Sequence, residues 1–132
     1  MKLNQSVADA VLALDVLWRQ RESSDEFHSA ISIARQAGIS EAYAVKLLRG
    51  LANSGIIEKQ TGRNGGFKVL RTPESTSLLA VIEAVGSRVD LESSVREAAD
   101  KRIALGFTEV STRLRRVLQQ ITLDVLVGTD EY

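Results

Sequence analysis

The stretch ISIARQAGISEAYAVKLLRGLANSG, residues 31–55, decides the fold. Apolar residues recur at helical spacing on both sides of Gly38, which predicts a short helix ending near Ala37 and a second helix from about Ser40 to Asn53. Glycine readily takes the left-handed backbone conformation that ends a helix, and serine is favoured at a helix start. Two helices joined in this way by about three residues predict a helix-turn-helix.

The second of these helices has an apolar face and a polar face. The residues expected to point inward are Leu47, Leu48, Leu51 and Ala52. The residues expected to point outward are Ala42, Tyr43, Lys46, Arg49 and Gly50. Basic and hydrogen-bonding side chains at the exposed N-terminal end of such a helix are typical of a helix that enters the major groove of DNA.

A second stretch, KQTGRNGGFKVLRTP at residues 59–73, begins a few residues after the helix pair. Apolar residues at 56–57, and then at 67, 69 and 70, are expected to form two strands, and Pro73 ends the second of them. The run Gly-Arg-Asn-Gly-Gly between them, residues 62–66, is rich in residues that adopt positive φ, as hairpin turns require. A β-hairpin directly after a helix-turn-helix predicts the wing of a winged helix.

The basic side chains of the hairpin have two explanations. Charged residues keep the edge of any small hairpin soluble, so they do not by themselves indicate DNA. However, residues 40–72 carry six Lys or Arg against two acidic residues, a local balance of +4, whereas the whole chain has a net charge of zero. A local positive field attracts a polyanion whatever the net charge. A nucleotide-binding loop is disfavoured, because the run lacks a Gly-Lys-Ser/Thr ending and a strand follows it.

The remainder of the chain is expected to be helical. We predict a first helix over about residues 6–19, a short helix that ends at Gly86, and a long helix after a break at Gly106. An apolar tail over residues 123–127 is expected to follow, with Thr122 as its cap. The long helix carries a coiled-coil-like apolar seam, which is either covered by a second subunit or packed on the first helix of the same chain. We expect dimerisation through Val110, Leu114, Val117, Leu118 and Ile121.

The composition excludes several kinds of chemistry. The chain has no cysteine, so it has no disulfide framework, no thiol nucleophile and no thiolate ligands for an iron–sulfur cluster. Its single histidine, His28, is expected to be an ordinary surface residue beside a polar loop. No nucleophile–base constellation indicates an enzyme, and no apolar run approaches the roughly 18 residues that a membrane span needs. We predict a cytoplasmic protein without a membrane partner, a metal or a cofactor.

These segments together resemble the Rrf-two family of bacterial winged-helix transcription regulators, along nearly the whole chain. The segments that carry the resemblance are MKLNQSVADAVLAL, GISEAYAVKLLRGLANSGII, GRNGGFKVLRTP, LLAVIEAV and VLQQITLDVLV. The resemblance implies a homodimer that binds a pseudo-palindromic operator as a repressor, with the helix near Ser40 in the major groove and the wing along the minor groove. It implies that the long helix pairs the two subunits.

Two departures from the family pattern stand out. Many members hold an iron–sulfur cluster on three cysteines before the long helix, whereas residues 89–107 contain none, so the chain resembles a cluster-free member. Relatives often place an arginine just before the first glycine of the wing turn. Here that position is Thr61, and the basic residue is Arg63.

The sequence therefore predicts a fold class and a set of DNA-binding residues. The fold class is mostly α with a small β-hairpin, divided into a DNA-binding domain over residues 1–75 and a linker and dimerisation region over residues 76–132. The residues expected at double-stranded DNA are Lys2, Ser40, Ala42, Tyr43, Lys46, Arg49, Lys59, Arg63, Asn64 and Lys68. A protein–protein module that regulates a partner enzyme is the competing function. An effector, either a small molecule or a protein, is left open, with residues 86–107 as the expected place for a small ligand.

Overall fold

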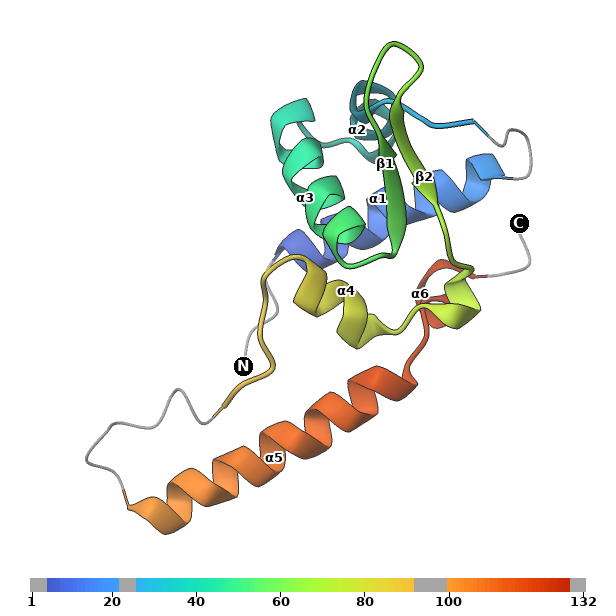
Figure 1. The fold of residues 1–132 in the computed structure, drawn as a ribbon. Coiled ribbons are helices and arrows are strands. Elements are labelled where there is room, and N and C mark those ends of the chain that lie inside the picture. Colours follow the sequence, from blue (N-terminus) through green and yellow to red (C-terminus); the bar gives the residue numbers. More distant parts are fainter. Residues whose placement is uncertain (1–4, 22–25, 92–99, 129–132) are drawn as a thin grey trace.

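The computed structural model describes residues 5–21, 26–91 and 100–128 (Figure 1). The elements are α1 (Gln5–Arg21), α2 (Ala30–Ala37), α3 (Glu41–Asn53), β1 (Ile57–Gln60), β2 (Gly66–Val69), the 3-10 helix η1 (Pro73–Ser75), α4 (Leu78–Ala84), α5 (Lys101–Gln120) and α6 (Asp124–Val127). The predicted fold class is confirmed, since helices surround one two-stranded antiparallel hairpin and a long helix lies near the C-terminus.

The turn between α2 and α3 forms as the sequence predicts. Gly38 adopts a φ of 74°, which is the left-handed region, and its N–H reaches the carbonyl of Ala34. Two residues later, the Ser40 hydroxyl accepts a hydrogen bond of 3.3 Å from the backbone N–H of Tyr43 and so caps α3. These two local devices set the direction in which α3 leaves the turn.

The inner face of α3 is confirmed in part, and one residue of the outer face is wrong. Leu47, Leu48 and Leu51 are buried as expected. Gly50, expected to face outward, lies against the C-terminal end of α4, where an added Cβ would overlap the carbonyl oxygen of Ala84. The absence of a side chain at residue 50 therefore lets α3 and α4 approach closely.

The hairpin is tied to the helices along both strands. The register places Ile57 opposite Val69 and Lys59 opposite Phe67. Phe67 also exchanges two backbone hydrogen bonds of 2.8 Å with His28, so the segment before α2 pairs with the outer side of β2. His28 is half-buried and not the plain surface residue that the sequence suggests. On α1, the buried Trp18 donates an indole hydrogen bond of 2.7 Å to the carbonyl of Arg71, just beyond β2.

One main apolar cluster joins the helix-turn-helix, the hairpin, α4 and the chain after α5. Its fully buried members include Leu14, Leu48, Ile56, Val81 and Leu123. The cluster draws residues from both sides of residue 75, and the two-domain division at that point stays a prediction.

The long helix α5 is continuous and begins earlier than predicted, at Lys101. It runs through Gly106, so the expected break is wrong. A glycine in a helix costs only about 1 kcal/mol relative to alanine, which does not interrupt a helix of 20 residues. The helix ends at Gln120, and the carbonyl of Ile121 accepts a hydrogen bond of 2.8 Å from the N–H of Leu78 at the start of α4.

The apolar tail after α5 is a short helix. Leu123, and not Thr122, occupies the N-cap position of α6, and no side chain caps it. The N–H of Leu123 lies 3.1 Å from the carbonyl of Pro73 and 3.0 Å from that of Thr76. This backbone contact fastens the end of α5 to the start of α4. In Figure 1, α4 lies between α5 and the helix-turn-helix with its wing.

The contact at Gly50 predicts an unusual response to alanine. Gly50→Ala is expected to lower the free energy of unfolding by about 1–3 kcal/mol, because the new methyl group would push α4 away from α3. The same change at Gly106, where an added Cβ meets nothing within 4 Å, is expected to raise it by about 0.5–1 kcal/mol. Urea unfolding of both variants measures the difference, and an unchanged midpoint for Gly50→Ala would contradict the close packing.

Candidate nucleic-acid interface

The recognition helix α3 and the strand β1 stand side by side and share a hollow of about 500 Å³. Arg49 of α3 and Lys59 of β1 both line this hollow, and both are exposed. Lys46 is exposed one turn earlier on α3. The structure thus brings together three of the predicted basic residues on one side of the molecule, at a concave place between the helix and the wing.

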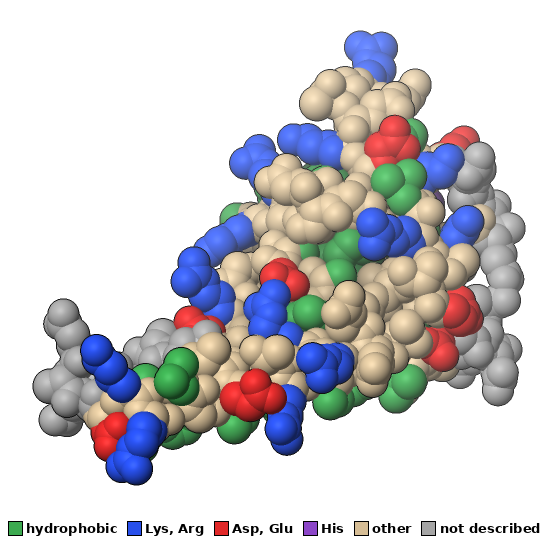
Figure 2. Space-filling view, turned by 60° about the horizontal axis from the view of Figure 1, so that its bottom comes forward, with side chains coloured by type: hydrophobic (Ala, Val, Ile, Leu, Met, Phe, Trp, Pro, Cys, Tyr) green, Lys and Arg blue, Asp and Glu red, His purple; other side chains and the backbone are tan. Residues whose placement is uncertain are grey.

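The tip of the wing carries the next two predicted residues. Arg63 and Asn64 are exposed in the turn, which is closed by a hydrogen bond of 3.1 Å from the N–H of Gly65 to the carbonyl of Gly62. They line a separate hollow of about 560 Å³ together with Glu26. Figure 2 shows the wing projecting from the body of the molecule with a basic side chain at its end. An acidic side chain therefore accompanies the basic one at the tip.

Lys68 is placed apart from the other predicted residues. Side chains alternate between the two faces of a strand, and Lys59 lies opposite Phe67, so Lys59 and Lys68 project to opposite faces of the hairpin. The Lys68 ammonium lies 5.8 Å from the centroid of the Phe27 ring, within the range of a cation–π contact. Lys68 does not line the hollow of Arg49 and Lys59, whereas Glu58, its partner across the hairpin, does.

The smaller predicted residues lie at the start of α3. Ser40 and Ala42 are exposed, and the Ser40 side chain is already engaged as the cap of the helix. Glu41 is exposed between them, so the first turn of α3 is not uniformly basic. Lys2 lies outside the described residues.

Tyr43 has a partner that the sequence analysis missed. Asp9 of α1 is only 7% exposed, and its carboxylate accepts a hydrogen bond of 3.2 Å from the side chain of Gln5. Burial first, and then the hydrogen bond and negative charge of Asp9, raise the pKa of the Tyr43 hydroxyl. A charged residue at a buried position of an otherwise apolar helix is the signal that could have revealed this contact. The hydroxyl of Tyr43 thus lies close enough to Asp9 of α1 to respond to its charge, and the residue as a whole is half-exposed.

An exposed apolar stripe follows α5. Ile103, Phe107, Val110, Leu114 and Val117 are spaced four, three, four and three residues apart, and all except Leu114 are exposed. Figure 2 shows hydrophobic side chains between the charged ones along this helix. The unbroken helix therefore extends the predicted seam toward its N-terminus.

Part of the predicted seam is already covered by the same chain. Leu114 and Leu118 are half-buried and pack against a small cluster formed by Val7, Leu79, Ile82 and Val89. Contact with the first helix and α4 thus accounts for one side of α5. It leaves the stripe that runs through Val110 and Val117 uncovered.

A helix-turn-helix whose second helix stands beside a basic β-hairpin defines the class of winged-helix DNA-binding proteins. The chain belongs to the Rrf2 family: a family model described as "Iron-dependent Transcriptional regulator" matches residues 3–129. The resemblance inferred from the sequence is confirmed.

Relatives and solved structures agree with this assignment. The chain is 27% identical over 124 residues to the HTH-type transcriptional regulator NsrR of Halalkalibacterium halodurans, covering 88% of this chain and 85% of the relative. It is 31% identical over 90 residues to the regulator IscR of Cereibacter sphaeroides, covering 68% and 58%. The structure of CymR, the global cysteine regulator of B. subtilis, superposes with a TM-score of 0.72 at 21% identity, covering 98% of this chain and 99% of CymR. These relatives are transcriptional regulators and not enzymes.

The family model is described as iron-dependent, but the side chains of this chain do not fit the iron–sulfur cluster that the sequence resemblance brings into question. A cluster is held by cysteine thiolates, and the sequence has none. Within residues 5–21, 26–91 and 100–128, no group of three or more acidic or histidine side chains is placed to hold a metal ion. In that same part of the chain, no helix has the length and apolar character of a membrane span.

The contact between Asp9 and Tyr43 predicts a measurable change in tyrosine ionisation. In Asp9→Asn the carboxylate charge is lost, so the pKa of Tyr43 is expected to fall toward its ordinary value. Absorbance titration near 295 nm, in a background with Tyr132→Phe so that Tyr43 is the remaining tyrosine, measures the pKa. Asp15→Asn on the outer side of α1 serves as the control, and an equal shift in both variants would contradict the contact.

Proposed function

We propose that the chain is a homodimeric repressor that binds a pseudo-palindromic operator in the cytoplasm, with no catalytic activity and no iron–sulfur cofactor. The observation that carries the proposal is the shared hollow between α3 and β1, in which Arg49 and Lys59 face the same space. The family assignment and the regulator relatives support it.

The dimensions and charges of this side favour duplex DNA. An α-helix fits the major groove of B-DNA, which is about 12 Å wide. Lys46 and the ring of Tyr43 lie in the first turns of α3, where recognition helices meet base edges. With α3 in the groove, Arg49 and Lys59 would face the phosphates on its rim, and Arg63 at the wing tip would reach the neighbouring minor groove.

The position of Tyr43 suggests how it would act. Because burial and the nearby Asp9 carboxylate both act on the hydroxyl of Tyr43, we expect its ring to be the part that meets DNA, and a ring edge suits a thymine methyl group better than a hydrogen-bonding base edge.

The stripe on α5 supports the dimer. Exposed apolar residues spaced four and three apart suit a second helix of the same kind. A two-fold pair of subunits would present two α3 helices to two half-sites, which is why a symmetric operator is proposed.

Salt dependence tests the DNA interface without knowledge of the operator. Binding to a mixed-sequence duplex is expected to weaken steeply with salt, and Arg49→Ala and Lys59→Ala are each expected to reduce the slope of log K against log salt by about one. Arg113→Ala on α5, where Arg113 pairs with Glu109 at 3.0 Å, removes the same charge away from the hollow and is expected to leave the slope unchanged. Binding that does not change with salt would favour the competing protein–protein module.

The dimer is tested by a charge placed on the stripe. Val117→Glu is expected to convert the dimer into monomers without lowering monomer stability, because Val117 is 53% exposed in the single chain. Leu105→Glu is the matched control, since Leu105 is 69% exposed on the same helix but lies off the stripe. Sedimentation equilibrium measures the molecular mass, and so the oligomeric state, of both variants. A Val117→Glu variant that stays dimeric would show that the subunits pair elsewhere.

A further inference from the structure

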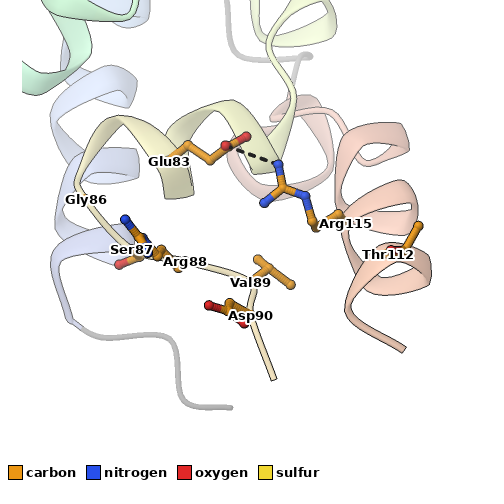
Figure 3. A pocket seen from close by; sticks show the side chains of 8 residues that line it. All are labelled: Glu83, Gly86, Ser87, Arg88, Val89, Asp90, Thr112 and Arg115. Carbon is orange, nitrogen blue, oxygen red and sulfur yellow. Dashed lines mark hydrogen bonds and ion pairs between the residues drawn. The ribbon is translucent and has the colours of Figure 1, made fainter. Parts of the chain in front are cut away.

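A third hollow, of about 670 Å³, lies between the end of α4, the segment after it and α5 (Figure 3). Its walls are formed by Glu83, Gly86, Ser87, Arg88, Val89, Asp90, Thr112 and Arg115. None of these residues belongs to the DNA interface described above. The hollow therefore needs an explanation of its own.

Among the residues that the structure describes, the charged side chains that line this hollow are equal in number and opposite in sign. Two guanidinium groups, on Arg88 and Arg115, oppose two carboxylates, on Glu83 and Asp90. In Figure 3 the Glu83–Arg115 ion pair, 3.3 Å long, spans one side of the space, with the side chains of Val89 and Asp90 across from it. Both members of the pair are about half exposed, so water and small solutes reach them.

The two guanidinium groups and two carboxylates in the lining indicate which kind of ligand would fit the hollow. An anion or a cation alone would add an unbalanced charge to a neutral group of four. A zwitterion adds none, and it offers a carboxylate for a guanidinium and an ammonium for a carboxylate. Val89 lines the hollow but is buried in the small cluster with Leu79 and Ile82, so the wall offers little apolar surface and favours a small polar ligand.

We propose that this hollow binds a free α-amino acid, with its carboxylate at Arg88 and Arg115 and its ammonium group at Glu83 and Asp90. Such a ligand inserts between α4 and α5. Its carboxylate then replaces Glu83 as the partner of Arg115, and its ammonium group replaces Arg115 as the partner of Glu83. It contacts the chain just after Ala84, whose carbonyl oxygen lies against Gly50 of the recognition helix.

The elements that form the hollow contact both the long helix α5 and the recognition helix α3. The hydroxyl of the buried Ser111 accepts a hydrogen bond of 2.7 Å from the N–H of Leu91, which ties the segment after α4 to α5. On the other side, α4 touches α3 at Gly50. A ligand that shifts the end of α4 therefore changes the position of α3, because the two helices touch at Gly50. This consequence for DNA rests on the proposed function, whereas binding of the amino acid does not.

Calorimetry with the full chain and each of the twenty amino acids tests the binding step. At least one is expected to bind, and Arg115→Gln and Glu83→Gln are each expected to weaken it roughly 10- to 100-fold, the loss of one charge-assisted hydrogen bond. Arg113→Gln, on the same helix and paired with Glu109, is expected to bind as the wild type does. All of these side chains are exposed, so the variants are expected to fold.

Absence of binding at millimolar concentrations of every amino acid would overturn the proposal. Equal weakening in the Arg113→Gln control would overturn it too, and so would binding of inorganic phosphate or succinate in place of any amino acid. In a second arm, the amino acid that binds is expected to change the affinity for DNA in the wild type and not in Arg115→Gln. Loss of DNA binding in all conditions would contradict the proposed function while leaving the calorimetric result intact.

Discussion

The close approach of α3 to α4 at Gly50 is the constraint on which the rest of the molecule depends. A side chain at this position would meet the carbonyl oxygen of Ala84, so the two helices touch backbone to backbone. Such contacts leave little freedom for sliding, because packed interiors resist even small changes in volume. The recognition helix is therefore oriented by its own turn at Gly38 and also by the element that leads to the long helix.

The far end of α5 is fixed to the same element. Leu123 is fully buried in the main cluster, and its backbone pairs with the carbonyls of Pro73 and Thr76 just before α4. Leu114 and Leu118 pack on the smaller cluster beside α4. The long helix is thus held at a set angle to α3, and its exposed stripe has a set position relative to the DNA interface. In the proposed two-fold pair, this geometry would set the separation of the two recognition helices, which in helix-turn-helix dimers matches one helical turn of DNA, about 34–36 Å, or a multiple of it.

Local chemistry in the sequence was sufficient for most of the elements, whereas the residues predicted to contact DNA stay a prediction. Gly38 and Ser40 act on their own neighbours, so the helix-turn-helix was predictable, and the glycine-rich run predicted the wing in the same way. The features that escaped prediction depend on residues far apart in the chain. The helical periodicity of residues 40–53 predicts that Gly50 faces outward, because it contains no information about the position of α4, and the influence of Asp9 on Tyr43 acts between two different helices. At Gly106 the low helix propensity of glycine is too weak to interrupt a helix that the residues on both sides stabilise.

Selection of fragments of the source genome by the purified protein, with sequencing of the bound pool, tests the central claim most directly. A dimer whose α3 helices are held by α4 and α5 predicts one enriched pseudo-palindromic sequence, with half-sites about 10–10.5 base pairs apart or a multiple of that spacing. A pool without an enriched sequence, or with single half-sites at no fixed spacing, would contradict it.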